Sequence, residues 1–269
     1  MRLMGLFLLA VLCGVQGARA QTGDLVATDA LRVCADPANL PFSNERGEGY
    51  ENRIAELLGR QLGLPVEYVF FPQVHGFVRN TLRARRCDLV MGTVAGDDLM
   101  QNTNPYYHTA YVIVVRRGAE VPETLQDPRM REMRLGAVAR TPPVDLLVRH
   151  GLMTSTRFVA LAVDTRVEAP AAELVQAVAR GELDAALVWG PVAGWYAKVH
   201  GLALELRPLP SEPGAARTDF RITMGIRGQE AEWRRRVNAA LRQVQPEIDA
   251  ILQEYGVPLL DQQGRLRTP

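Results

Sequence analysis

The stretch LRVCADPANLPFSNERGEGYENRIAE, residues 31–56, decides the fold of this chain. It opens with a short apolar strand at Leu31 and Val33, continues through a loop rich in proline and glycine, and enters a helix near Glu51. A strand, a loop and a helix in this order form the first unit of an α/β lobe. Loops at the carboxyl ends of such strands face the crevice in which α/β proteins bind ligands. The stretch therefore predicts one wall of a binding cleft.

The segment before this strand predicts export. An apolar run, residues 3–15, follows Arg2, and the small residues of the segment ARA, residues 18–20, suit a cleavage site. We expect residues 1–20 to be a cleaved signal peptide and the mature protein to be periplasmic. The alternative is an N-terminal membrane anchor, for which the apolar run is short.

The composition excludes several classes of function. A formal net charge of +1 gives no electrostatic case for binding nucleic acid or a membrane surface. No phosphate-binding loop and no nucleophile motif occurs, and the four histidines lack the spacing of a zinc site or a catalytic triad. We therefore expect no enzyme activity, no metal site and no cofactor of its own. The four histidines are His75, His108, His150 and His200.

Two cysteines remain once the predicted signal peptide, which contains Cys13, is removed. Cys34 lies in the first predicted strand, and Cys87 directly precedes the strand of residues 88–92. Neighbouring parallel strands would bring the two Cα atoms within roughly 4.4–6.8 Å, the range of a disulfide. In an oxidising compartment the pair predicts a structural disulfide, and two buried free thiols are the alternative.

Apolar runs and helix-breaking residues predict two α/β lobes. Residues 111–115 and 220–226 are runs that we expect to cross between the lobes, and the final helix should be bent or broken at Pro246. In the first lobe we expect strands at 31–36, 66–71 and 88–92 and helices at 51–62 and 76–86. In the second we expect strands at 135–138, 158–161 and 184–189, helices at 144–150, 171–180 and 194–200, an irregular segment at 208–214, and a final helix at 230–253.

One sequence pattern occurs in both predicted lobes. The segment RRCDLVMG, residues 85–92, and the segment GELDAALVWG, residues 181–190, each place an aspartate before an apolar strand. The repetition predicts two similar lobes, each a small, mostly parallel sheet flanked by helices, with two hinge crossings and a cleft between them. We expect residues 24–114 and 220–269 to form lobe 1, and residues 115–219 to form lobe 2.

Three stretches give a more specific resemblance. Residues 31–58, 76–92 and 104–118 resemble the type II periplasmic solute-binding fold and, within it, the MxaJ/XoxJ-type proteins associated with PQQ-dependent methanol dehydrogenases. This resemblance implies the two-lobe type II fold. It also implies a non-enzymatic accessory of lanthanide- or calcium-dependent methanol oxidation, with the dehydrogenase and its c-type cytochrome as partners. The PQQ and the metal would belong to the dehydrogenase.

The chain departs from amino-acid-binding relatives at both halves of their ligand clamp. Those relatives resemble one another in a T-x-E-R loop after the third strand, whose arginine holds the ligand carboxylate. Here the loop is TVAGDD, residues 93–98, and an acid replaces the arginine. The acid that holds the ligand ammonium follows the second-lobe strand, where this chain has WGP, residues 189–191. Simple amino-acid binding is therefore not expected.

The residues predicted to line the cleft come from the loops after the strands. Asp36 is either a polar ligand contact or a cap for backbone amides, and Trp189 either lines the cleft or packs between lobes. Of Tyr106 and its neighbour, one should line the cleft while the other packs. Asp97 and Asp98 are either metal-binding or solvated. The full set is Asp36, Asn39, Phe42, Ser43, Tyr50, Thr93, Asp97, Tyr106 and Trp189.

Glu48 and Glu51 flank a glycine and a tyrosine, but nothing in the sequence marks either as an acid of raised pKa.

The sequence is compatible with two functions. The chain is either an accessory protein that assists the dehydrogenase or the receptor of an ABC importer for a small ligand other than an amino acid.

Overall fold

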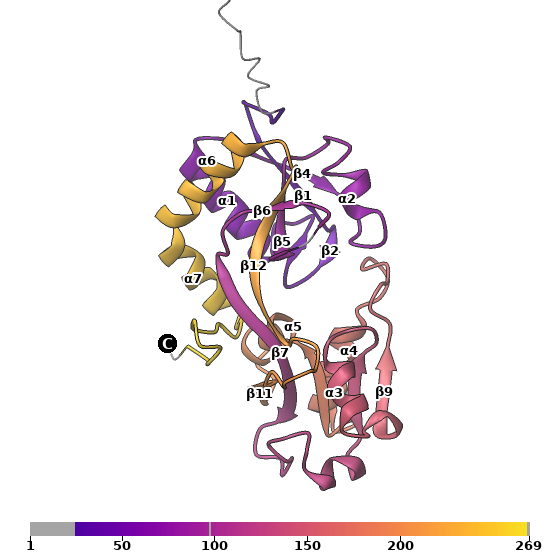
Figure 1. The fold of residues 1–269 in the computed structure, drawn as a ribbon. Coiled ribbons are helices and arrows are strands. Elements are labelled where there is room, and N and C mark those ends of the chain that lie inside the picture. Colours follow the sequence, from indigo (N-terminus) through magenta and orange to yellow (C-terminus); the bar gives the residue numbers. More distant parts are fainter. Residues whose placement is uncertain (1–24, 97, 268–269) are drawn as a thin grey trace, which may run out of the picture.

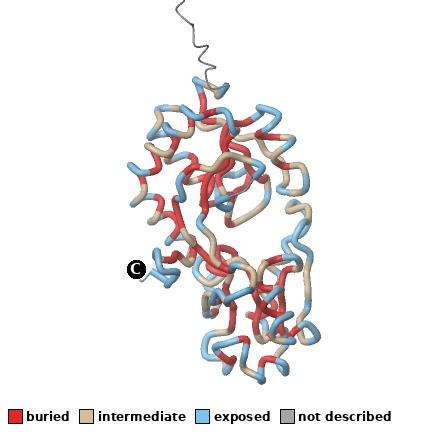
Figure 2. Tube along the Cα trace, viewed as in Figure 1, coloured by how far each residue is buried: buried red, intermediate tan, exposed pale blue. Residues whose placement is uncertain are grey.

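The structure is a computed structural model that describes residues 25–96 and 98–267. The predicted signal peptide, residues 1–20, and Asp97 lie outside the described residues. Two lobes lie one above the other and are joined by two long strands, so the mostly parallel, two-lobe α/β fold is confirmed (Figure 1). Buried residues concentrate along the sheets and on the inner faces of the helices, and exposed residues lie on the rim (Figure 2).

Lobe 1 is built on a sheet with the strand order β4-β1-β5-β12, in which β4, β1 and β5 are parallel and β12 is antiparallel to β5. Its strands are β1 (Leu31–Ala35), β4 (Val66–Phe70), β5 (Leu89–Val94), β6 (Gln101–Asn102) and β12 (Asp219–Ile226). A small hairpin of β2 (Ala38–Asn39) and β3 (Ser43–Asn44) lies beside it. Its helices are α1 (Tyr50–Leu62), α2 (Phe77–Asn80), α6 (Ala231–Gln243) and α7 (Gln245–Glu254).

Lobe 2 repeats this arrangement with the order β7-β10-β8-β9, in which β10, β8 and β9 are parallel and β7 is antiparallel to β10. Its strands are β7 (Tyr107–Arg116), β8 (Leu135–Val138), β9 (Thr156–Val159), β10 (Ala185–Trp189) and β11 (Leu204–Pro208). Its helices are α3 (Pro143–Arg149), α4 (Pro170–Arg180) and α5 (Gly190–Lys198), with short 3-10 turns η1 (Pro128–Glu132) and η2 (Met153–Ser155).

Strand β7 belongs to both lobes. Its first part, residues 107–110, pairs antiparallel with β12, and its second part, residues 111–115, pairs antiparallel with β10. The chain returns from lobe 2 to lobe 1 through β12. The two hinge strands therefore lie side by side, and a small rotation about them would change the separation of the lobes.

The repeated aspartate has the same structural role in both lobes. Arg32 in β1 makes two hydrogen bonds to Asp88, from Nε at 2.7 Å and from Nη2 at 2.8 Å. Arg134, just before β8, makes the same pair to Asp184, at 3.1 and 2.7 Å. The first pair ties β1 to the start of β5, and the second ties the start of β8 to the start of β10. Only the planar guanidinium of arginine supplies this two-point geometry. The sequence echo thus marks a structural clamp in each lobe.

The predicted disulfide is present. Cys34 and Cys87 are bonded, with their Cα atoms 5.4 Å apart, and both lie in a buried cluster with Phe77, Leu82 and Val90. The bond joins Cys34 in β1 to Cys87, two residues before β5. The parallel pairing of β1 with β5 brings the two cysteines close together.

Two segments differ from the expected elements, and the break expected in the final helix near Pro246 is confirmed. Helix α2 ends at Asn80 because Thr81 leaves the helical conformation, at φ −119° and ψ −84°, and the amides of Arg83 and Arg86 then bond to carbonyls five residues back. Strand β11 forms just before the expected irregular segment, in residues for which no element was expected, because it pairs with β7. The final helix is broken at Val244, since Pro246 in the first turn of α7 has no amide hydrogen to continue α6.

Candidate functional site: an apolar cavity between the lobes

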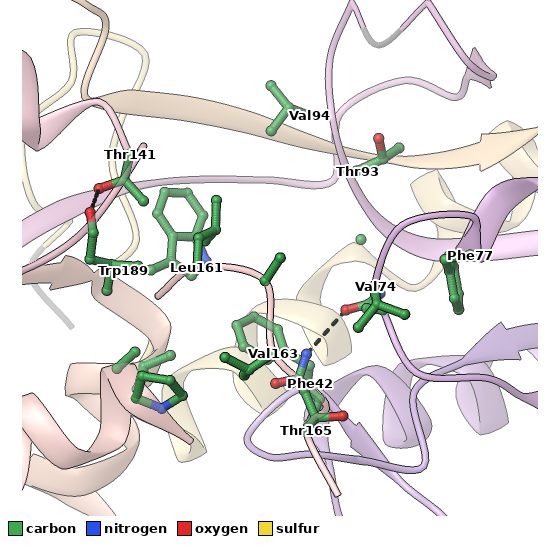
Figure 3. A pocket seen from close by; sticks show the side chains of 18 of the residues that line it. Phe42, Val74, Phe77, Thr93, Val94, Thr141, Leu161, Val163, Thr165 and Trp189 are labelled. Carbon is green, nitrogen blue, oxygen red and sulfur yellow. Dashed lines mark hydrogen bonds between the residues drawn. The ribbon is translucent and has the colours of Figure 1, made fainter. Parts of the chain in front are cut away.

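A cavity of about 930 Å³ lies between the lobes. Lobe 1 contributes the β2 loop, the segment before α2 and the end of β5, and lobe 2 contributes the segment between β9 and α4. Figure 3 shows side chains from both lobes, among them Phe42, Thr93, Leu161 and Trp189, converging on this space. The cavity therefore lies where the two-lobe pattern predicts a binding cleft.

Aromatic rings form the wall near the hinge. Tyr111 of β7, Trp189 at the end of β10 and Phe220 of β12 contact one another, with ring centroids 4.9–6.2 Å apart. All three line the cavity, together with Phe42 and Tyr107. Trp189 therefore has both of its expected roles: it lines the cavity, and it packs against Tyr111 and Phe220 of the two hinge strands. An aromatic wall of this kind favours apolar ligands or side chains.

The first turn of α1 is held against the loop before it. The amides of Tyr50 and Glu51 donate to the carbonyls of Pro41 and Phe42, both at 2.9 Å. A Cβ at Gly49 would lie 2.0 Å from the Phe42 carbonyl oxygen, so this approach requires glycine. The proline- and glycine-rich loop therefore places Phe42 and the start of α1 in the same cavity wall.

Asp36 caps backbone amides and also joins the lobes. Its side chain accepts from the amide of Ala38 at 2.9 Å and from that of Gln73 at 2.6 Å. It also accepts from the hydroxyl of Thr165 in lobe 2 at 2.7 Å. Asp36 is fully buried and does not line the cavity, so its contacts favour the capping role over a ligand contact.

Glu51 is a buried carboxyl in the cavity wall. The residue is 6% exposed, and burial, followed by repulsion from Asp36, raises the pKa of Glu51 to about 8. Neighbouring Glu48 behaves in the opposite way, since a hydrogen bond from Asn44 lowers its pKa. The sequence shows no difference between the two glutamates, because the difference arises from the tertiary burial of α1.

Charged groups also surround the rim. The carboxyl, guanidinium and imidazole groups other than Glu51 that line the cavity among the described residues are exposed. They are His75, Arg79, Arg83 and Glu168. The site thus has an apolar interior, one buried carboxyl and a solvated, charged rim.

Four of the nine predicted site residues line the cavity, and four do not. Ser43 is buried and bonds to the backbone of Asp36, Tyr50 is enclosed between Phe42 and Tyr107, and Tyr106 donates to the Met91 carbonyl at 2.7 Å. The residues in the lining are Asn39, Phe42, Thr93 and Trp189. Those outside it are Asp36, Ser43, Tyr50 and Tyr106, and Asp97 lies outside the described residues.

The correction at the tyrosine pair has a simple cause. Tyr107, the first residue of β7, reaches the cavity from the lobe 1 core, whereas Tyr106, the residue before the strand, is held inside that core by its hydrogen bond to the Met91 carbonyl. Sequence reasoning also missed Glu51, Tyr111, Phe220 and the segment of residues 160–165. A signal for the two aromatic residues was available, because both lie in the predicted crossing strands that border the cleft.

Two other kinds of feature are absent from residues 25–96 and 98–267. No group of three metal-ligating side chains (histidine, cysteine, aspartate or glutamate) gathers within them. None of the helices in this part of the chain has the length and apolar character needed to span a bilayer.

Comparison with known proteins identifies the family. Residues 31–258 match the bacterial extracellular solute-binding proteins, family 3. Protein MoxJ of Methylorubrum extorquens is 29% identical over 94% of this chain and 91% of its own length.

Two solved structures are similar over most of the chain. The periplasmic binding protein XoxJ from Methylobacterium extorquens is 39% identical, with a TM-score of 0.74, over 87% of this chain and 100% of that one. MxaJ from Methlophaga aminisulfidivorans is 26% identical, with a TM-score of 0.75, over 86% of this chain and 100% of that one. The chain belongs to the bacterial extracellular solute-binding proteins, family 3, and within it to the MxaJ/XoxJ-type periplasmic binding proteins.

Proposed function

We propose that this chain is a periplasmic accessory protein of a PQQ-dependent methanol dehydrogenase and binds the dehydrogenase through the interlobe cavity. The likeness to MoxJ, MxaJ and XoxJ supports the proposal, since the resemblance of the sequence to MxaJ/XoxJ-type proteins implies an association with that dehydrogenase. The PQQ and the lanthanide or calcium ion would be held by the dehydrogenase, and its c-type cytochrome is a further candidate partner.

The observation that carries the proposal is the character of the cavity. Phe42, Trp189 and Phe220 line an apolar space of about 930 Å³ that is open at a charged rim. Protein interfaces bind most strongly where apolar and aromatic side chains bury one another inside a polar rim. The cavity would accept an apolar segment of the partner in this way, and binding would stabilise the conformation in which that segment is exposed.

The polar groups of the cavity do not form an amino-acid clamp. At the end of β5 the lining residues are Gly92, Thr93 and Val94, and after β10 the lining residue is Trp189. Arg79 and Arg83, the two arginines in the lining, are exposed and belong to the α2 region. A free amino acid would therefore lose water from its carboxylate without gaining a buried partner.

Calorimetry with purified apo- and holo-dehydrogenase tests the proposal. We expect micromolar or tighter binding to the apo-enzyme, and faster recovery of its activity when PQQ and metal are supplied together with this protein. Trp189→Ala should weaken binding at least tenfold, because it removes a central aromatic anchor. Val167→Ala is the matched control, since Val167 is 79% exposed and outside the lining. Absence of binding heat with both forms of the dehydrogenase would refute the proposal.

A second function is favoured by the size of the cavity. A volume of about 930 Å³ lies within the range of roughly 300–1,000 Å³ that is typical of small-molecule sites. The chain would then be the receptor of an importer for a small ligand other than an amino acid. Thermal unfolding with amino acids, organic acids, PQQ and lanthanide salts tests this, since a ligand at 100 times its Kd adds about 2.7 kcal/mol. A flat response to all of them would exclude these ligands.

A further inference from the structure

The buried carboxyl of Glu51 has no partner that explains its position. Glu51 is 6% exposed and lines the cavity from the first turn of α1. No hydrogen bond or ion pair joins its side chain to any of the residues that the structure describes. Removing a carboxyl group from water without a partner is costly, so a structure that retains one beside a cavity points to a group that arrives with the ligand.

Gly92 leaves the carboxyl open to the cavity. A Cβ at position 92 would lie 2.3 Å from Oε1 of Glu51, and Gly92 is itself part of the cavity lining. The glycine does not have a positive φ, so its backbone conformation does not demand the absence of a side chain. Its lack of a side chain instead provides the space that the Glu51 carboxyl occupies at the cavity wall.

The groups that face Glu51 are all acidic or neutral. Asp36 raises its pKa by charge repulsion, and the phenols of Tyr50, Tyr106 and Tyr107 each interact with it electrostatically. The basic groups in the cavity lining are exposed at the rim. The interior therefore presents a negative group, or one that becomes negative on losing a proton, without a compensating cation.

We propose that the cavity binds an apolar group that carries a primary ammonium, and that this ammonium pairs with the carboxylate of Glu51. The inference rests on the cavity being the binding site, as in the proposed function, and names the chemistry of what enters it. The surrounding rings, Phe42 and Tyr107 among them, would bury the apolar part and offer their faces to the cation. The acid for this ammonium lies on α1 of lobe 1. In amino-acid-binding relatives, by contrast, the acid for the ligand ammonium follows the lobe 2 strand that corresponds to β10.

Binding is coupled to the release of one proton. Free Glu51 is largely a neutral acid at pH 7, because burial raises its pKa to about 8. The arriving ammonium favours the carboxylate, so the O–H bond of the acid breaks and the proton passes to buffer. The ammonium keeps its own protons, and the bound state is a carboxylate–ammonium pair.

Calorimetry with three probes of the same apolar body tests the inference: 4-phenylbutylamine, 4-phenylbutanol and 4-phenylbutyrate. We expect the amine to bind at least tenfold more tightly than the alcohol, and the carboxylate to bind most weakly. Titrations in buffers of different ionisation enthalpy should show that the amine releases most of one proton at pH 7 and that the alcohol releases none. Equal affinities for amine and alcohol would overturn the inference.

Variants assign the effect to Glu51. Glu51→Gln keeps the volume and should lower amine affinity at least tenfold, abolish proton release and leave alcohol affinity unchanged. Gly92→Ala should have the same selectivity, because its Cβ would displace the Glu51 carboxyl, and Glu123→Gln, at an exposed position outside the cavity lining, is the matched control that should bind normally. A circular dichroism melt shows that each variant is folded. If Glu51→Gln lowered amine and alcohol affinity equally, the carboxyl would not be the counter-ion.

A second pair of probes distinguishes a lysine side chain of a protein segment from a free amine. An acetylated, amidated apolar peptide with one central lysine is compared with the same peptide carrying norleucine there. Preference for the lysine peptide over both norleucine peptide and 4-phenylbutylamine indicates a protein segment, whereas binding of the small amine alone indicates a small molecule. None of these probes contains the dehydrogenase, so failure of dehydrogenase binding and failure of the Glu51 pairing are separate results.

Discussion

Thr165 of lobe 2 donates a hydrogen bond from its hydroxyl to Oδ1 of Asp36 in lobe 1, at 2.7 Å. The segment that carries Thr165 rises toward lobe 1 on the side of the cavity away from the hinge strands (Figure 1). On the hinge side, α5 of lobe 2 approaches the residues after α7 so closely that Gly194 and Gly256 are in backbone contact. The two lobes therefore touch on both sides of the cavity, and the structure is a closed form.

Thr165→Val should shift the protein toward an open form. The substitution keeps the shape of the side chain and removes the hydroxyl, so the closed form loses a hydrogen bond worth about 1–2 kcal/mol, or roughly tenfold in the closing equilibrium. Small-angle X-ray scattering should show a larger radius of gyration. Thr156→Val is the control, because the Thr156 hydroxyl bonds to the Leu152 carbonyl within lobe 2. Identical scattering from all three proteins would contradict the closing role of Thr165.

The stability of the protein should depend on pH through Glu51. Its pKa rises from 4.5 to about 8 on folding, so between these values the unfolded chain has lost a proton that the folded chain keeps. The contribution of this group is complete below about pH 4.5 and is lost as the pH rises to about 8, by up to about 1.4 kcal/mol per pH unit.

Urea unfolding at pH 5, 6.5 and 8 measures this effect in the wild type and in Glu51→Gln. We expect the free energy of unfolding of the wild type, relative to that of the variant, to fall with each step to higher pH, because glutamine does not titrate. Titration of the remaining groups cancels in the difference between the two proteins. A difference that stays constant from pH 5 to 8 would show that the Glu51 carboxyl titrates normally.

Loss of the disulfide should destabilise lobe 1 strongly. Cys34 and Cys87 are separated by 53 residues, and closing a loop of this length corresponds to about 4 kcal/mol in the chain-entropy description. The double variant Cys34→Ala/Cys87→Ala should therefore unfold at a much lower urea concentration. Adding a reductant should lower the midpoint of the wild type toward that of the variant and leave the variant unchanged. Equal midpoints for all samples would mean that the bond contributes nothing.

Gly194→Ala should weaken the hinge-side contact. A Cβ at position 194 would lie 1.9 Å from the carbonyl oxygen of Gly256, so α5 or the chain after α7 has to move. Overpacking of this kind costs about 1–3 kcal/mol, which lowers the melting temperature. Gly228→Ala is the control, since its Cβ would meet nothing within 4 Å. A melting temperature for Gly194→Ala equal to that of the control would show that the two segments separate readily.

Much of the fold follows from local patterns. The strands at 31, 66, 89, 135 and 185 lie within a few residues of their predicted positions, because short apolar runs between helix breakers form buried strands. The final helix is broken next to Pro246 for an equally local reason, the missing amide hydrogen. The early end of helix α2 and the formation of strand β11 were not anticipated, since the first depends on the non-helical backbone of Thr81 and the second on pairing with β7.

The candidate site depended more on contacts between distant parts of the chain. Asn39, Phe42, Thr93 and Trp189 lie at strand ends, and they line the cavity as strand order predicts. Asp36 and Ser43 lie at a strand end as well, but their hydrogen bonds to neighbouring backbone groups keep them inside the loop. A local pattern places residues near a cleft, and the hydrogen bonds then decide which of them face it.

The sequence by itself determined the two-lobe order of strands and helices, the pairing of Cys34 with Cys87, and the loss of the amino-acid clamp, because each depends on residue type and order along the chain. Only the tertiary structure decided that Tyr107 rather than its neighbour lines the cavity, and that Thr165 reaches Asp36. It alone made Glu51 a buried acid of raised pKa, because desolvation and charge repulsion arise from segments that meet only in the folded chain.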